Sequence, residues 1–221
     1  MKLNLNAKKV AGVGAVALFS LAMSGTAAAA PTAIGVTSTV QNALTVTKVA
    51  DMNLGSIFAT TASSGGYRWM TLSTASTMSA PQGSGAGTIL SLGGMSAGDA
   101  TVAVSSTTPF NLTLPAFEVA LNADGTTNLA TVTGFTSPVE VQLADPLVAR
   151  FTLANFRAGT PTGGTVAAGC ATSNVCAMTP SFGTTDMGFK IGADIVTDLS
   201  GTRVTYEAGT YTGTFDVSAT Y

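Results

Sequence analysis

Apolar and polar residues alternate along most of the chain after residue 30. The longest regular run places Met187, Phe189, Ile191, Ala193 and Ile195 at every second position. Successive side chains of a β-strand point to opposite faces of a sheet, so this run predicts a strand with one buried face. Shorter runs with the same period lie at 44–46, 102–104, 110–114, 117–121, 139–143, 151–153 and 211–221. No segment after residue 30 shows a convincing 3.6-residue apolar period, so we expect no amphipathic helix.

Turn-forming residues separate these runs. Glycines cluster at 65–66, 83–87 and 163–164, and Asp124-Gly125 stands between two strand-like runs. Asp-Gly in that setting is a strong signal for a β-hairpin. Many short strands with Gly-rich turns predict an all-β sandwich or barrel. Residues 158–181 alternate only weakly, and we expect them to form a long surface loop.

The start of the chain has the three parts of a secretory signal peptide. Lys2, Lys8 and Lys9 give a positive beginning, residues 10–23 are mostly apolar, and residues 24–30 are small and end in alanines. The apolar part is short for a transmembrane helix, which makes an uncleaved anchor the weaker alternative. We therefore expect export to the periplasm, the cell surface or the medium.

This signal defines the expected organisation of the chain. We predict cleavage near 29/30, so that residues 1–29 are removed and the mature chain begins at Ala30. Residues 30–43 then form an N-terminal extension, and residues 44–221 are long enough for one domain with a sizeable core.

Charge is scarce in this sequence. Charged residues make up 9% of the chain, against about 25% in an ordinary soluble domain. Three of the nine basic residues lie in the signal peptide, so the mature chain has six against eleven acidic ones, a net charge of −5. It lacks the basic surface that nucleic acid or an anionic membrane requires. A nearly uncharged surface also suits close packing against other copies, because little like-charge repulsion opposes contact.

The residues that carry most enzyme chemistry are also scarce. The sequence has no histidine, the commonest general base and metal ligand, and no G-x-S-x-G motif. Two scattered carboxylates can still meet in space, as glycosidases require. Asp194 and Asp198 flank a turn, but without a D-x-D-x-D-G loop they are a weak candidate for calcium. We predict no catalytic residue, no cofactor site and no metal site, and hence no enzyme.

The two cysteines lie close together in the sequence. Cys170 and Cys176 have five residues between them, and in an oxidising compartment such a pair is expected to close a small loop as a disulfide. Free thiols or an intermolecular bridge are the alternatives. Because the loop is short and expected to be peripheral, we expect replacement of both cysteines by serine to cost little.

Motifs at both ends of the domain resemble a known family. Residues 44–57 have the form of a strand and turn, x-L-x-F-G-x-I, with Leu54 in place of the usual aromatic. Residues 208–221 resemble a final strand, G-x-Y-x-G-x-F-x-V-x-x-x-Y, and residues 189–194 resemble the strand before it. Together they resemble domain-of-unknown-function family 4402 of exported bacterial proteins and, more loosely, chaperone–usher pilus and spore-coat-U-like subunits. The resemblance implies an immunoglobulin-like antiparallel β-sandwich, export and, as partners, a periplasmic chaperone and an outer-membrane assembly protein.

Both ends of the mature chain are candidates for self-association. The extension alternates and is uncharged, and it would offer Ile34, Val36 and Val40 as a donor strand to another copy. A frayed tail or an extra strand of the same domain is the alternative. The last run is expected to be a strand at a sheet edge, with an alternating apolar set. That set consists of Tyr211, Phe215, Val217, Ala219 and Tyr221.

The sequence therefore predicts a non-enzymatic structural protein, a pilin-like subunit of a bacterial surface fibre or coat that assembles by β-strand addition. The first alternative is a monomeric surface module that binds glycan or protein. For that function Tyr67 and Trp69 are either an exposed stacking platform or, as we prefer, part of the core. The second alternative is an outer-membrane β-barrel, which is typical of longer strands and aromatic girdles.

Overall fold

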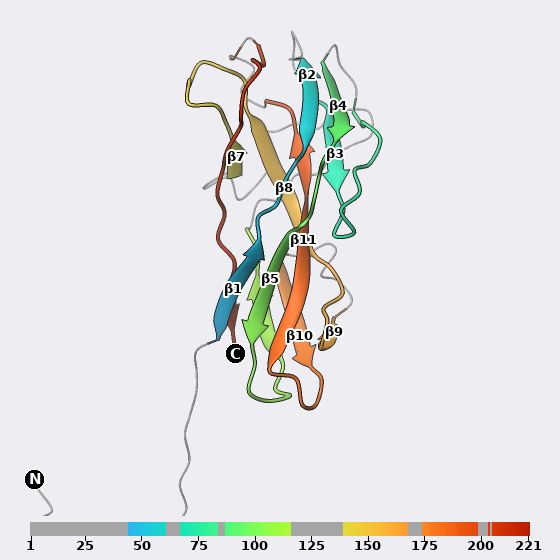
Figure 1. Cartoon of the computed structure of the whole chain (residues 1–221), viewed down its shortest axis with the longest axis vertical. Coiled ribbons are helices and arrows are strands. Elements are labelled where there is room, and N and C mark those ends of the chain that lie inside the picture. Colours follow the sequence, from blue (N-terminus) through green and yellow to red (C-terminus); the bar gives the residue numbers. More distant parts are fainter. Residues whose placement is uncertain are drawn as a thin grey trace, which may run out of the picture. The chain divides into compact units, whose positions relative to one another are not determined.

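The computed structural model describes residues 44–60, 67–83, 87–115, 139–167, 174–198, 203 and 205–221. They belong to one compact unit, Gln41–Tyr221. Within this part of the chain there are twelve β-strands and no helix (Figure 1). All of the paired strands are antiparallel.

The larger sheet has six strands. Its order is β1 (Thr45–Ala50), β5 (Gly98–Ala103), β11 (Asp186–Val196), β8 (Phe151–Ala158) and β7 (Val139–Val141), and β3 (Trp69–Leu72) also pairs with β11. The long strand β11 is central because β5 pairs with its first half, β3 with its second half, and β8 with its other edge. The sequence signal was strongest for this strand, which is buried over most of its length.

The second sheet packs against the first. Its order is β12 (Ser218–Thr220), β6 (Phe110–Thr113), β10 (Val175–Pro180) and β9 (Gly164–Val166). The core between the sheets includes side chains that are almost fully buried: Met70, Leu72, Val102, Leu112, Met178, Met187 and Ile195. This arrangement confirms the predicted all-β antiparallel sandwich.

A two-stranded ribbon extends the sandwich. It pairs β2 (Ser56–Thr60) with β4 (Thr88–Gly93), and a bridge between Asn53 and Ser96 joins it to the β1–β5 pair. Gly55 lies at the junction with φ +72°. A Cβ at Gly55 would collide with the backbone of residues 93–95, so this close approach of two strands requires glycine. The chain from β1 to β2 thus runs along one side of the domain (Figure 1).

One loop predicted from the sequence is wrong, and one predicted strand and hairpin lie outside the described residues. The expected long loop at 158–181 is wrong in large part, because it contains β9 and β10. In β10 the inward positions are held by Cys176, Met178 and Pro180, which are not typical strand formers, so the alternation was weak in the sequence. The strand expected at 117–121 and the Asp124-Gly125 hairpin lie outside the described residues.

Candidate functional site: a groove beside the last strand

A groove of about 1010 Å³ opens into the core along one side of the sandwich. One wall is formed by the chain from Val46 to Ala59 and the other by residues 206–217. In Figure 1, β1 and β2 run upward in blue and cyan, while the C-terminal segment descends in red. The floor consists of core side chains, among them Phe151, Leu153 and Ile191. The groove is therefore an opening along the edge of the sandwich, where its two sheets are not joined.

The first wall contains two edge strands, β1 and β2. In the described part of the chain, β1 pairs with β5 alone and β2 with β4 alone. Val46, Met52, Leu54 and Ile57 line the groove and are only partly buried, although all four pack against the core. Such an edge combines exposed apolar side chains with main-chain groups that no strand satisfies.

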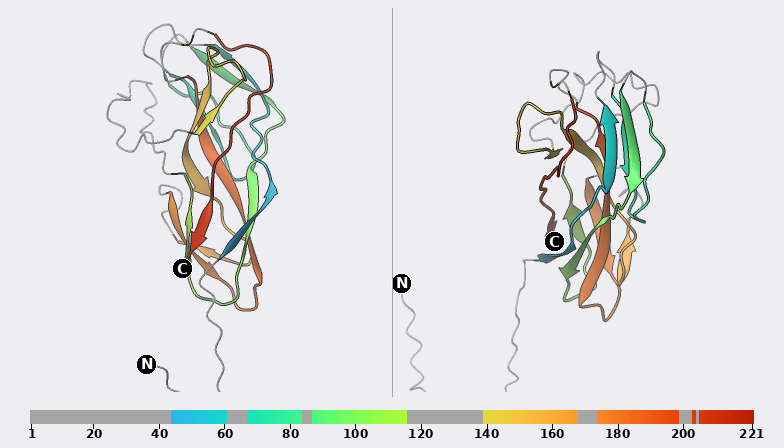
Figure 2. Two further views of the ribbon diagram at one scale, coloured as in Figure 1. Left: turned by 90° about the vertical axis from the view of Figure 1, so that its left-hand side faces the viewer. Right: turned by 45° about the horizontal axis from the view of Figure 1, so that its top comes forward.

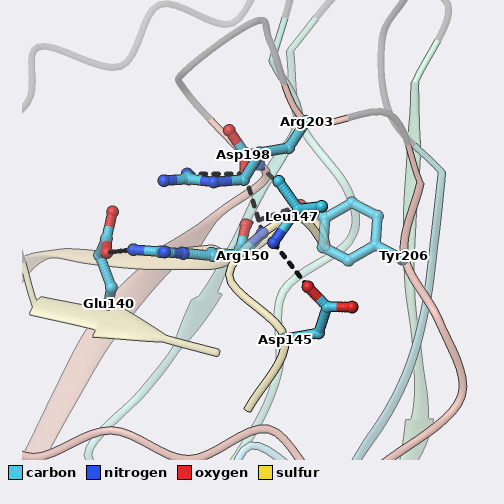
Figure 3. Close-up of polar contacts among 7 residues, drawn as sticks. All are labelled: Glu140, Asp145, Leu147, Arg150, Asp198, Arg203 and Tyr206. Atoms are coloured by element: carbon cyan, nitrogen blue, oxygen red, sulfur yellow. Dashed lines mark hydrogen bonds and ion pairs between the residues drawn. The ribbon is translucent and has the colours of Figure 1, made fainter. Parts of the chain in front are cut away.

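The second wall is fixed at its upper end by Tyr206 (Figure 3). The Tyr206 hydroxyl donates to the backbone carbonyl of Arg150 at 2.9 Å and accepts from the backbone N–H of Asp198 at 2.6 Å. Its ring stacks on Phe151 with 4.7 Å between centroids, and the Tyr211 ring lies 5.3 Å from Phe151. Burial raises the pKa of Tyr206 well above its usual 10.0, so the phenol remains a hydrogen-bond donor.

Ion pairs around Tyr206 hold several segments together (Figure 3). The Arg150 guanidinium pairs with Glu140 of β7, and its backbone N–H donates to Asp198 at 2.9 Å. Asp198 also pairs with Arg203 at 3.1 Å. These contacts join β7, the end of β11 and the start of the C-terminal segment, so their role is structural.

The middle of the second wall has few backbone partners. Thr212 and Gln142 exchange two backbone hydrogen bonds of 2.9 Å, and Phe215 packs against Phe156 with 4.9 Å between ring centroids. From there until β12 pairs with β6, no backbone hydrogen bond joins residues 214–217 to another described segment. Within the described chain, β1 is thus paired along one edge only, and residues 214–217 have no backbone partner.

The structure places the predicted site residues as follows. Tyr211, Phe215 and Val217 line the groove, whereas Tyr221 does not and is exposed. Among the described residues, the predicted strand at 211–221 is paired only over Ser218–Thr220 and at Thr212. The proposed donor residues Ile34, Val36 and Val40 lie outside the described residues.

Other sequence candidates are found away from the groove. Cys176 is disulfide-bonded and only 1% exposed, on β10 in the core, while Cys170 lies outside the described residues. The expectation of a peripheral Cys176 is therefore wrong. Tyr67 is buried and Trp69 half-buried, as expected for core residues.

Asp194 and Asp198 do not form a joint site. Asp194 is buried and accepts hydrogen bonds from Thr71 at 2.7 Å, Asn155 at 2.8 Å and Arg157 at 2.8 Å. Asn155 has φ +50°, a conformation that asparagine tolerates and that this hydrogen bond helps to hold. Each carboxylate is thus neutralised by its own arginine, which leaves little charge for a cation.

The sequence analysis did not identify the chain from Val46 to Ala59 as one wall of a groove. The alternation at 44–57 identified a strand, but nothing local shows that one of its edges has no partner. In the part of the chain that the structure describes, no three His, Cys, Asp or Glu residues are grouped to hold a metal. The described residues also contain no apolar helix of membrane-spanning length.

Comparison with known proteins found no match. No family model, no curated protein and no solved structure matches this chain. The resemblance to family 4402 and to pilus subunits therefore stays a hypothesis that rests on motifs at the two ends of the domain.

Proposed function

We propose that this protein is a non-enzymatic, exported structural subunit of a bacterial surface fibre or coat, and that its subunits join by β-strand addition. The observation that supports this proposal is the groove between the chain from Val46 to Ala59 and residues 206–217. Its volume of about 1010 Å³ is at the upper end of the range of about 300–1,000 Å³ for small-molecule pockets. It lies between the edge strands β1 and β2 on one side and residues 206–217 on the other, an arrangement that suits an extended peptide.

A strand placed in this groove would satisfy main-chain groups on both sides. It would hydrogen-bond to the open edge of β1 and to the unpaired residues 214–217, and its inward side chains would cover the core floor. Each aliphatic side chain buried in this way contributes about 1.5–3 kcal/mol, before the cost of ordering the incoming segment. A partner strand in the groove would therefore stabilise this fold.

The charges around the groove are compatible with an uncharged strand. Among the charged residues that line the groove, Lys48 pairs with Asp51 at 2.8 Å and Asp99 pairs with Lys190 at 2.7 Å, and the carboxylates of Glu207 and Asp216 also lie on its walls. Repulsion between copies is weak because the whole chain carries few charges. The same proposal includes export by a signal peptide. It also includes two assembly partners, a periplasmic chaperone and an outer-membrane assembly protein.

The test has two parts. The first is whether the secreted protein assembles, and the second is whether assembly shields the groove from solvent. Sedimentation and negative-stain microscopy should show concentration-dependent oligomers or filaments. A Ser56→Cys thiol on the groove wall should react with maleimide in the monomer and become protected in the assembly. The matched control is a Val49→Cys thiol. Val49 lies on β1 but does not line the groove, and its native side chain is 59% exposed, so this thiol should stay reactive in the assembly.

A second candidate function has its own observation. On the outer face of the ribbon Phe58 is 52% exposed and faces Leu90, which is 46% exposed, across the two strands, and Leu92 is 65% exposed. An apolar patch of this kind suits a surface module that binds protein or glycan as a monomer. A protein that remains monomeric at every concentration, with Ser56→Cys always reactive, would favour this function over a fibre subunit.

A further inference from the structure

We infer that the outer face of the four-stranded sheet β12-β6-β10-β9 is a contact between copies of this protein, in which the same face of a neighbouring chain packs against it. The inference rests on the proposed function, because it adds a lateral contact to subunits that are already joined in series. The contact is separate from the groove, since no residue of these four strands lines the groove.

The four-stranded sheet has no charged residue in any of its strands. The larger sheet, in contrast, carries charges on every strand except β3, and Lys190 and Asp99 form an exposed pair there at 2.7 Å. Both views in Figure 2 show the four-stranded sheet in the half of the domain that holds the C-terminus. Charged side chains normally keep the surfaces of soluble proteins from binding their own copies. This sheet lacks that protection.

The outward side chains of the sheet are small and stand in rows. The strand registers give two rows of three, Ser218, Thr113 and Val175 in one and Thr220, Asn111 and Ala177 in the next. A third row pairs Thr179 of β10 with Thr165 of β9. All of these residues are exposed except Thr113, which is half-buried. Side chains of this size let two sheets approach to the usual spacing of about 10 Å.

The chemistry of this face favours a second copy as its partner. Hydroxyl and amide groups both donate and accept hydrogen bonds, so a face of Thr, Ser and Asn can pair with an identical face. A face of like charges would instead repel its own copy. A contact about a two-fold axis uses the same surface of both chains and therefore requires this self-complementarity. Val175, which is 46% exposed, adds apolar surface that such a contact would cover.

The area of the face decides how strong the contact is. Four strands about 4.8 Å apart and three rows about 6.6 Å apart give a face of about 19 Å by 20 Å. Two copies would bury about 800 Å² in all, less than the roughly 1,200 Å² of a stable complex. The contact is therefore too weak to hold two free chains together at low concentration. Between subunits joined in series it repeats along the assembly, and repeated weak contacts reinforce one another.

Charge reversal at the centre of the face tests the inference. Asn111→Asp keeps the shape of the side chain and adds a negative charge to the middle row, whereas Asn111→Lys adds a positive one. Negative-stain microscopy should show filaments side by side for the parent and single filaments for each variant. In sedimentation, the concentration needed for lateral association should rise at least about tenfold, because like charges meet across the contact. Filaments of the two variants, assembled separately and then mixed, should pair again.

The matched control is Thr47→Asp, which adds the same charge to the larger sheet. Thr47 is exposed on β1 and does not line the groove, so these filaments should pair like those of the parent. Single filaments of the parent, or pairs that persist in both Asn111 variants, would overturn the inference and leave strand addition intact.

A chain that forms no filaments would reject the proposed function and leave the face to be tested alone. A mixture of Asn111→Asp and Asn111→Lys at millimolar concentration should then form dimers that neither variant forms by itself, as measured by sedimentation equilibrium. A mixture that remains monomeric would overturn the inference as well.

Discussion

Replacing Tyr206 by phenylalanine removes one oxygen and leaves the aromatic packing in place. The hydroxyl bonds the Arg150 carbonyl at 2.9 Å and the Asp198 N–H at 2.6 Å, both partly buried. A buried polar group that loses its partner costs about 1–3 kcal/mol. Because water can reach part of this site, we expect Tyr206→Phe to lower the free energy of unfolding by about 2 kcal/mol in all.

The matched control is Tyr211→Phe in the same aromatic cluster. Among the described residues, the Tyr211 hydroxyl bonds only the exposed backbone of Glu207: it accepts from the N–H and donates to the carbonyl, each at 3.2 Å. Its loss should cost less than about 0.5 kcal/mol. Urea unfolding of the non-reduced chain at low concentration, followed by the fluorescence of Trp69, the only tryptophan, measures both values. The reasoning fails if Tyr206→Phe unfolds within 0.5 kcal/mol of the parent, or if the two variants cost about the same.

The same pair of variants predicts a pH dependence. Burial raises the pKa of Tyr206 in the folded chain above its ordinary 10.0, so the phenol holds its proton to a higher pH when folded. Its contribution is complete below pH 10.0 and is lost as the pH rises above that value, by at most about 1.4 kcal/mol per pH unit. Tyr206→Phe should lack this loss, so the difference between parent and variant should shrink above pH 10.0.

Four further expectations follow from the same residues. Val36→Asp should fold but fail to assemble in sedimentation, because it places an unpaired charge in the groove, whereas Thr37→Asp on the opposite face should assemble like the parent. Cys176→Ser should lower the urea midpoint more than Cys176→Ala, since a hydroxyl enters the core, and labelling of the denatured, unreduced parent should find no free thiol. Arg157→Met should cost about 3 kcal/mol by leaving buried Asp194 without its cation, and Asp194→Asn in that background should recover part of the loss. Mass spectrometry of the secreted protein should show a chain that begins near Ala30, and retention of Met1 would contradict the predicted signal peptide.

Part of the candidate site was visible in the sequence. The alternation at 211–221 identified Tyr211, Phe215 and Val217 as one apolar face, and the structure places these three residues in the groove. The expectation that residues 211–221 form one strand along their whole length is not met. Whether an extended segment becomes a paired strand depends on a neighbour that is remote in the sequence, and in the described chain residues 214–217 have none.

Side-chain roles set by distant contacts were not predictable either. Tyr206 stands in no alternating run, and its hydroxyl is held by residues 56 and 8 positions away. The weak alternation at 158–181 predicted a loop around Cys176, yet this residue faces the core from β10. The role of Tyr206 arises where the C-terminal segment passes the ends of β8 and β11, and that of Cys176 from the packing of one sheet on the other; no local pattern encodes either contact.

By itself, the sequence determined the fold class and the positions of several strands. Side-chain periodicity is a property of neighbouring residues, so Met187 to Ile195 identified β11 before any contact was known. The tertiary structure alone decided which strands pair, that β1 and residues 214–217 have no further partner among the described strands, and that β12 comes close to β1. Hydrogen bonding between strands and the packing of two sheets join residues that are far apart in the chain, so a groove left by a missing strand becomes visible only when the sandwich has formed.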